Sequence, residues 1–181
     1  MPEPPCRVIA CDAAGCRPHV LAQVDAIFWE TTLHPPEQPS EREAFRERWL
    51  GRYLCGGSDI LLLAVAGHDT VAGYLVGTVE SPAGQPRFDD IGYFRGAFAH
   101  LLPRFPAHLH VNLAAEFRNR GLGSRLIESF AERARNAGAP GMHVVTGQGM
   151  RNVRFYRRSG FVECALAPWK GGTLVFLGRE L

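Results

Sequence analysis

The chain has 181 residues, of which 46% are hydrophobic and 21% are charged, a composition typical of one globular domain with a sizeable core. Its formal net charge of +2 is too small to favour nucleic acid as a partner, and it holds no apolar run of about 18 residues that would cross a membrane. The first residues lack the charged and apolar regions of a secretory signal, so we expect a cytoplasmic location.

The N-terminal third predicts one strand and two helices. CRVIAC at 6–11 has the pattern of a short strand, and Asp12 is placed to cap the helix predicted at 19–30, where apolar residues recur at helical spacing. After a proline-rich loop, a second helix is predicted to begin at Ser40 and to end near the glycine pair 56–57.

Cysteines are frequent in this part of the chain. The sequence has five cysteines and no C-x-x-C pair, and an odd number in a cytosolic chain predicts free thiols rather than a disulfide framework. Cys6, Cys11, Cys16 and His19 have the residue types of a metal site. Their spacing is not that of a zinc knuckle, so no metal site is predicted.

A hairpin and a long irregular segment come next. Strands are predicted at 60–66 and 71–80, joined by a turn. Residues 81–106 contain four prolines and the aromatic stretch YFRGAFAH at 93–100. A loop of this length inside a compact domain is usually functional or mobile. Three roles stay open for the aromatic stretch: the lining of an acceptor groove, a dimer contact or a lid.

The C-terminal half alternates strands and helices. AHLHVNL at 107–113 alternates as a half-buried strand does, and residues 121–138 form the most regular amphipathic helix, ending at Gly138. A short helix at 152–160 is closed by Gly160. Further strands are predicted at 142–147, 161–166 and 173–178. The order is therefore βααββ, long loop, βαβαββ, which predicts a single α/β domain over residues 1–181.

The stretch FRNRGLGSRL at 117–126 follows a strand and opens a helix. Free backbone N–H groups and the helix dipole favour an anion at such a place. Gly121 and Gly123 let a ligand approach the backbone and permit positive φ angles. Polar and charged side chains accompany them: Arg118, Arg120, Ser124 and Arg125. Taken alone, the stretch is equally compatible with a phosphate site and with an ordinary glycine-rich helix start carrying solvated arginines.

Other phosphate-binding loops are disfavoured. The chain has no G-x-x-x-x-G-K-[ST] motif, and its only lysine is Lys170. A dinucleotide-binding loop would need glycine where Leu126 stands, and an acidic residue where the next strand ends in Thr146 and Gly147.

Two stretches together resemble the signature motifs of the GNAT acetyltransferases. HVNLAAEFRNRGLGSRLIESF is similar to the acetyl-CoA pyrophosphate loop of that family, and NVRFYRRSGF is similar to its short helix with a tyrosine and a Gly-Phe end. The resemblance covers residues 107–166, and the order of elements fits the family over nearly the whole chain. FPAHLHVNL, RNVRFYRRSGF and LVFLGREL resemble more closely the acetyltransferase-like C-terminal domain of O-GlcNAcases, whose hydrolase domain does not fit in this length.

The resemblance implies a fold and a cosubstrate. The GNAT fold is an α/β (α+β) fold with a mixed, largely antiparallel sheet of six to seven strands flanked by about four helices. Strand 107–113 would splay from strand 142–147, and the pantetheine of acetyl-CoA would lie in the gap. The cofactor-binding residues that the resemblance implies are Val111, Asn112, Leu113, Arg118, Asn119, Arg120, Gly121, Leu122, Gly123, Ser124, Asn152 and Phe155.

One position departs from the family pattern. Many GNAT sequences carry asparagine seven residues before the tyrosine, where this chain has Gly149. Asn152 stands where a small apolar residue is usual, so the role of the asparagine has either moved to Asn152 or been lost.

The resemblance also implies one catalytic group. Tyr156 corresponds to the tyrosine that protonates the departing CoA thiolate, and the alternative is a core aromatic residue beside Phe155. The general base is not given by the resemblance. His108, His110 and Asn112 share one face of the strand, and His110 is the best-placed candidate; the alternative is a structural or simply polar histidine, which is the more frequent case on a strand. Other carboxylates are no better supported as bases: Glu80, Asp89 and Asp90.

The function expected is N-acetyl transfer from acetyl-CoA to an amine of a protein lysine, a protein N-terminus or a small molecule. The acceptor would meet residues 81–106 and the first two helices. The alternative is an inactive acetyl-CoA-binding or protein-interaction module, a pseudo-acetyltransferase. We expect a monomer or homodimer that binds neither nucleic acid nor membrane.

Overall fold

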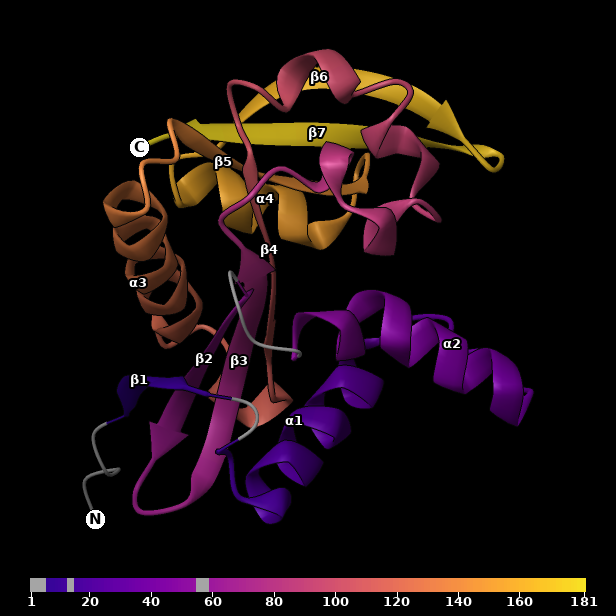
Figure 1. Cartoon of the computed structure of the whole chain (residues 1–181). Coiled ribbons are helices and arrows are strands. Elements are labelled where there is room, and N and C mark those ends of the chain that lie inside the picture. Colours follow the sequence, from indigo (N-terminus) through magenta and orange to yellow (C-terminus); the bar gives the residue numbers. More distant parts are fainter. Residues whose placement is uncertain (1–5, 13–14, 55–58) are drawn as a thin grey trace. The chain divides into compact units, whose positions relative to one another are not determined.

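The computed structural model describes residues 6–12, 15–54 and 59–181 (Figure 1). Within them the helices are α1 (Pro18–Thr31), α2 (Pro39–Trp49), α3 (Leu122–Asn136) and α4 (Arg151–Arg158). The strands are β1 (Arg7–Cys11), β2 (Asp59–Ala66), β3 (Thr70–Thr78), β4 (Ala107–Leu113), β5 (Gly141–Gly147), β6 (Val162–Trp169) and β7 (Gly172–Glu180). The strands make a seven-stranded sheet in the order β1-β2-β3-β4-β5-β7-β6. This confirms the predicted class, a mixed α/β fold with seven strands and four helices.

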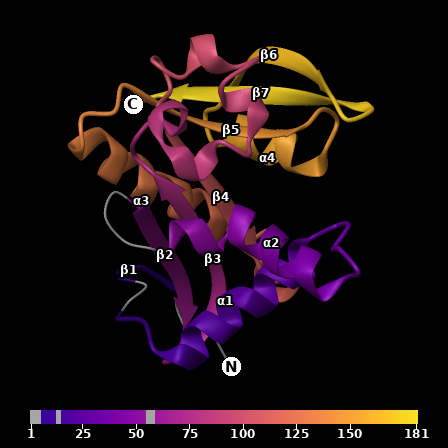
Figure 2. The same cartoon turned by 45° about the vertical axis from the view of Figure 1, so that its right-hand side comes forward.

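The chain forms two compact units. The first unit contains residues 1–77 and 110–130, and the second contains residues 78–109 and 131–181. β4 and α3 each contribute residues to both. Figures 1 and 2 follow the chain through each unit in two views.

The first unit is built on β1, β2 and β3. β1 pairs antiparallel with β2, with Ile9 opposite Leu63, and β2 is buried from Leu61 onward. α1 buries a stripe at i, i+4, i+7 and i+8, the spacing that the sequence predicted: Val20, Val24, Ile27 and Phe28. The amphipathic pattern of α1 therefore defines which of its faces meets the core.

Two details of the helices differ from the prediction. Asp12 does not cap α1, because Arg17 occupies the N-cap position without a side-chain cap and Pro18 begins the helix. α2 begins at Pro39 and ends at Trp49, before a short 3-10 helix at Gly51–Tyr53. The glycine pair 56–57, where the second helix was expected to end, lies outside the described residues.

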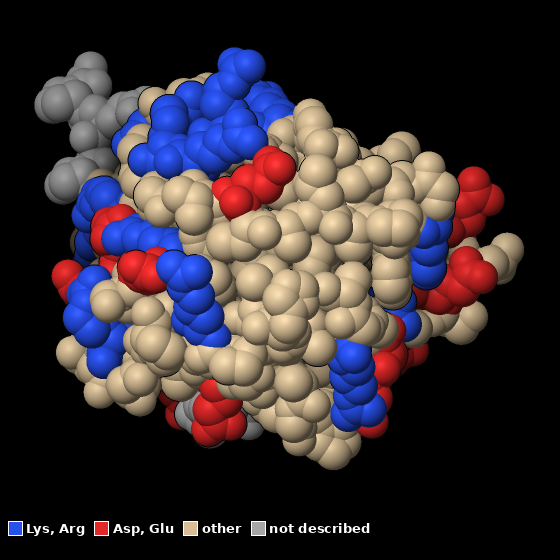
Figure 3. Space-filling view, turned by 90° about the horizontal axis from the view of Figure 1, so that it is seen from above, with Lys and Arg blue, Asp and Glu red and all other residues tan. Residues whose placement is uncertain are grey.

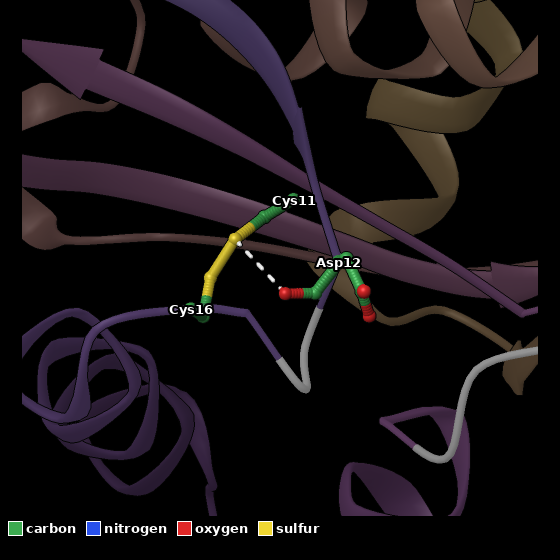
Figure 4. Close-up of a disulfide and its surroundings, with 3 residues drawn as sticks. All are labelled: Cys11, Asp12 and Cys16. Carbon is green, nitrogen blue, oxygen red and sulfur yellow. Dashed lines mark hydrogen bonds between the residues drawn. A yellow bond between two sulfur atoms is a disulfide. The ribbon is translucent and has the colours of Figure 1, made fainter.

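A disulfide joins Cys11 to Cys16 (Figure 4). The prediction of free thiols is wrong for these two cysteines and holds for Cys6 and Cys164. The end of β1 and the approach to α1 bring the two Cα atoms to 6.3 Å, within the range that a disulfide needs. A rule based on the number of cysteines cannot detect two residues that a local turn brings together.

The second unit contains β5, β7 and β6 as antiparallel neighbours, and β4 pairs parallel with β5 at His108 and His143. Residues 81–106 contain four short 3-10 helices: Pro82–Gly84, Pro86–Phe88, Gly92–Phe94 and Ala99–Leu101. The aromatic side chains of this segment are buried, so they pack inside the second unit: Phe88, Tyr93, Phe94, Phe98 and Phe105. The ring centroids of Tyr93 and Trp169 are 5.5 Å apart, and those of Phe98 and Phe176 are 5.4 Å apart.

Phe105 shows how closely this aromatic layer approaches the sheet. A Cβ atom added to Gly178 would lie 2.7 Å from the Phe105 ring, and one added to Gly141 would also lie 2.7 Å from it. Two glycines on adjacent strands thus make room for one phenyl ring. The buried aromatic side chains of residues 81–106 are part of the core of the second unit.

Charge is unevenly distributed over the surface. On the face in Figure 3, Lys and Arg side chains gather in one group, whereas elsewhere on this face basic and acidic side chains lie beside one another. None of the helices in the described part of the chain combines the length and the apolar character needed to cross a bilayer.

Candidate active site

The glycine-rich stretch connects β4 to α3. After β4, a 3-10 helix at Ala115–Phe117 leads to Asn119 and Gly121, whose φ angles of 62° and 76° are both in the left-handed region. Asparagine and glycine are the residues that adopt this conformation at least cost. α3 begins at Leu122, whose side chain is 3% exposed and anchors the helix start in the core.

Several backbone N–H groups at this turn are not used in backbone hydrogen bonds. Among the described residues, those of Asn119 and of Gly121 to Ser124 donate to no backbone carbonyl, whereas the Arg125 N–H reaches the Gly121 carbonyl at 3.1 Å. The N–H groups before it point away from the helix carbonyls, as at every helix start. A Cβ at Gly121 would meet no atom within 4 Å. We call the backbone from Asn119 to Ser124 the anion cradle.

The arginines around the cradle differ in their contacts. Arg118 donates from Nε to the Leu113 carbonyl at 3.0 Å, and Arg125 donates to the Cys6 carbonyl at 2.8 Å. Arg120 is exposed, with its guanidinium 5.5 Å from the Phe117 ring centroid. The guanidinium groups of Arg118 and Arg125 therefore hold the protein backbone, whereas that of the exposed Arg120 lies beside an aromatic ring.

The second half of β4 presents half-buried residues to the first unit. The side-chain amide of Asn112 donates to the Tyr74 hydroxyl at 2.9 Å. Val111 and Leu113 are half-buried on alternate positions. β3 approaches closely here, because a Cβ at Gly73 would lie 2.7 Å from the Asn112 carbonyl.

His110 lies among aromatic side chains of the first unit. Its Nε2 is 3.1 Å from the Tyr53 hydroxyl, and its ring packs edge-on against Trp49 at 5.5 Å. Burial, and then the charge of Arg52, lower the pKa of His110 from 6.5 to about 4. The imidazole is therefore neutral at physiological pH, the state in which a base accepts a proton.

Tyr156 occupies α4 in the second unit. Its side chain is 6% exposed and packs against Phe155 and Phe161, with ring centroids 5.2 and 5.6 Å away. Burial raises its pKa, so the phenol is fully protonated at neutral pH. Among the described residues, its hydroxyl has no hydrogen-bond partner. The ring of Tyr156 is thus packed in the core while its hydroxyl stays protonated, so a packing role does not exclude a role as proton donor.

Asn152 connects α4 to the end of β5. Its side-chain amide lies 3.0 and 3.1 Å from the Thr146 hydroxyl. Gly149, in the turn between them, has a φ of 78°, which glycine adopts without strain. Gly149, the position that departs from the family pattern, therefore provides the left-handed residue of the turn. Asn152 ties the start of α4 to Thr146 at the end of β5.

The remaining candidate bases lie elsewhere in the second unit. His108 is 3% exposed and packs its ring 5.0 Å from Phe88. Asp89 pairs with Arg95, and Glu80 and Asp90 are exposed. In the described part of the chain, no group of three His, Cys, Asp or Glu side chains is arranged to hold a metal ion.

Sequence reasoning missed two contributors from distant elements. Tyr53 contacts His110, and Glu30 accepts a hydrogen bond from the Ala115 N–H at 2.9 Å. Both are separated from their partners by more than fifty residues of sequence. The spacing of neighbouring residues cannot predict contacts between segments so far apart in the sequence.

The family is shown by sequence. The model of the acetyltransferase (GNAT) family matches residues 21–161, which includes β4, the anion cradle and α4. The chain therefore belongs to the GNAT acetyltransferase family. The match runs through both compact units.

Solved structures share the fold over almost their whole length. A protein from Desulfovibrio desulfuricans assigned to the GNAT family is 19% identical, with a TM-score of 0.68 over 97% of this chain and 99% of that one. A GCN5-related N-acetyltransferase from Kribbella flavida is 17% identical, with a TM-score of 0.66 over 97% and 98%. An acetyltransferase from Bacillus subtilis, solved with CoA, is 14% identical, with a TM-score of 0.59 over 98% and 99%.

Proposed function

We propose that the protein is an acetyl-CoA-dependent N-acetyltransferase that moves the acetyl group directly to an amine. The observation that carries this proposal is the anion cradle. The N–H groups of Asn119 and of Gly121 to Ser124, which donate to no backbone carbonyl among the described residues, the left-handed residues and the open space beside Gly121 fit a pyrophosphate. Family membership and the CoA bound to the Bacillus subtilis acetyltransferase support acetyl-CoA as the ligand. The cytoplasm is the location that we propose.

Acetyl-CoA supplies an activated thioester, and the protein positions it. In the proposed reaction the amine nitrogen attacks the thioester carbonyl, the carbon–sulfur bond breaks, and the thiolate takes the Tyr156 proton. The raised pKa of Tyr156 keeps the phenol protonated at neutral pH, so that the proton is available when negative charge develops on sulfur, although it also makes the phenol a weaker acid. Backbone groups of Val111 and Leu113 would hold the pantetheine, and Asn152 and Phe155 would line its sulfur end.

His110 is the proposed acceptor of the amine proton. Its pKa of about 4 keeps it neutral, but the same value makes it a weak base for an ammonium ion. We therefore propose that the acceptor reaches the enzyme already as the free amine, and that His110 takes the proton only as the new amide forms.

A second candidate is an acetyl-CoA-binding module without activity. The glycine at position 149 favours it, because this residue supplies no side chain where many relatives have an amide. The closer resemblance to the C-terminal domain of O-GlcNAcases, a sequence prediction, points the same way. Both candidates bind acetyl-CoA through the cradle, but only the acetyltransferase needs the Tyr156 hydroxyl.

The cradle is tested by two matched glycine substitutions. Gly121 and Gly138 have φ angles of 76° and 81°, and a Cβ on either meets nothing within 4 Å. Gly121→Ala and Gly138→Ala should each lose about 1 kcal/mol of stability through backbone strain. Only Gly121→Ala should weaken acetyl-CoA binding, by about tenfold, in isothermal titration calorimetry. Equal affinities for the two variants, or no binding by the wild type, would refute the cradle.

Activity separates the two candidates. A panel of amines is screened for release of free CoA by the wild type, Tyr156→Phe and the control Tyr93→Phe, which removes a hydroxyl from the aromatic layer. An enzyme should lose about 100-fold in kcat in Tyr156→Phe alone, with unchanged acetyl-CoA affinity. Tight binding without release of CoA for any amine would instead establish the binding module.

A further inference from the structure

Glu30, near the C-terminal end of α1, lies against the segment that leads into the anion cradle. One carboxylate oxygen, Oε1, accepts from the Ala115 N–H at 2.9 Å and lies 3.3 Å from Arg118 Nη2. Arg118 in turn donates from Nε to the Leu113 carbonyl at 3.0 Å. One carboxylate and one guanidinium therefore connect α1, the end of β4 and the 3-10 helix before the cradle. We call Glu30 and Arg118 the clamp.

The clamp supplies a missing helix cap. Ala115 begins the 3-10 helix, and the residue before it, Ala114, has no side chain able to cap its N–H groups. Glu30 provides the acceptor from another element. The Ala114 N–H donates to Ala72 of β3 at 3.1 Å, so the chain is held from two sides just before the cradle.

The clamp contributes little to global stability. The side chains of Arg118 and Glu30 are 36% and 43% exposed, and such surface ion pairs contribute less than about 1 kcal/mol. Its effect is local: it fixes the residue immediately before Asn119, where the chain enters the left-handed turn. After this residue, the N–H groups of Gly121 to Ser124 keep their direction without a backbone acceptor among the described residues.

We propose that Glu30 is a positioning residue, which acts through Arg118 and the Ala115 N–H to hold the anion cradle in the geometry that receives pyrophosphate. This rests on the proposed function of the cradle. The arginine that sequence reasoning assigned to phosphate then has a structural task, and its charge is satisfied by Glu30. Recognition of the anion falls to the backbone N–H groups and to the exposed Arg120.

The first test compares binding of two probes to purified full-length variants. CoA carries the pyrophosphate, whereas pantetheine lacks it. Glu30→Ala should raise the Kd for CoA about tenfold and leave the pantetheine affinity within about twofold, and Glu30→Gln, which keeps an acceptor for Ala115, should lie between. The control is Glu43→Ala, an exposed glutamate on α2. An unchanged Kd for CoA in Glu30→Ala, or an equal loss for both probes, would overturn the proposal.

The second test does not depend on CoA. Hydrogen exchange of the backbone amides at 115–124 is measured in the free proteins. Exchange should be faster in Glu30→Ala than in the wild type or Glu43→Ala, with an unchanged melting temperature. If the wild type fails to bind CoA, the function proposed for the cradle is wrong. Equal exchange rates in all three proteins would show that Glu30 does not position the cradle, whether or not the wild type binds CoA.

Discussion

His110 shows how the fold sets the chemistry of one side chain. It shares its surroundings with the Tyr53 hydroxyl, the Trp49 ring and the Arg52 charge, all from the first unit. A histidine at this point of an exposed strand would titrate near pH 6.5, whereas this one has a pKa of about 4. Burial and the charge of Arg52 both oppose protonation of the imidazole.

This environment predicts how stability depends on pH. Between pH 6.5 and about 4 the unfolded chain binds a proton at His110 that the folded protein does not, so folding stability falls as pH falls through this window. The loss should reach about 2 to 3 kcal/mol. Denaturant unfolding at pH 7 and pH 4 should show it in the wild type and not in His110→Gln. The exposed His34→Gln is the control, and parallel pH profiles for all three would contradict the assignment.

Residue-scale prediction from sequence succeeded where a residue's role is local. The left-handed turn at Gly121 and the caps at Gly138 and Gly160 follow from glycine alone, and all three have positive φ angles. It failed for partners brought together by the fold, because Glu30 and Tyr53 have no sequence feature that points to Arg118 or His110. The hydrogen bonds from Arg118 and Arg125 to backbone carbonyl groups also depend on the fold and could not be predicted from the sequence.

At the scale of elements, the disulfide between β1 and α1 closes a very short loop. In the chain-entropy view, a loop of this size stabilises the fold by about 2 kcal/mol. Reduction with a thiol should therefore lower the melting temperature by about 5 °C.

The control for this prediction is the variant Cys11→Ser/Cys16→Ser. It should melt at the temperature of the reduced wild type and should not respond to the thiol. A melting temperature that is equal with and without the thiol in the wild type would contradict the bond.

Strands and helices were predictable wherever hydrophobic periodicity was strong. β4 begins and ends at the predicted residues, and the bounds of α1, α3 and α4 differ from the prediction by one or two residues at every end. Residues 81–106 were not predictable by the same means, because 3-10 helices of three residues carry no period long enough to detect. Their burial depends on Trp169 and Phe176, which lie far along the chain.

At the scale of the whole molecule, the question is whether the two compact units unfold together. One family model runs through both, and we propose a single domain over residues 1–181. Trp29 and Trp49 belong to the first unit and Trp169 to the second. In Trp169→Phe, and separately in Trp29→Phe/Trp49→Phe, the fluorescence transition should coincide with the far-UV circular dichroism transition of the same variant.

Ligand strengthens this test. At about one hundred times its Kd, acetyl-CoA should stabilise the protein by about 2.7 kcal/mol, and both reporters should move together. Two separated transitions, or a shift in one reporter only, would show that the units unfold independently.

The cradle has a consequence for how such a protein can change over time. In the proposed site most ligand contacts are backbone N–H groups, so most side-chain substitutions at its surface would leave them in place; the constrained positions would be the residues with positive φ, Glu30 and Arg118. Variation would then be free to accumulate on α2 and on the rest of α1. An engineer seeking a new acceptor should diversify those helices, leave 119–124 and Glu30 untouched, and expect the same thioester to be used throughout.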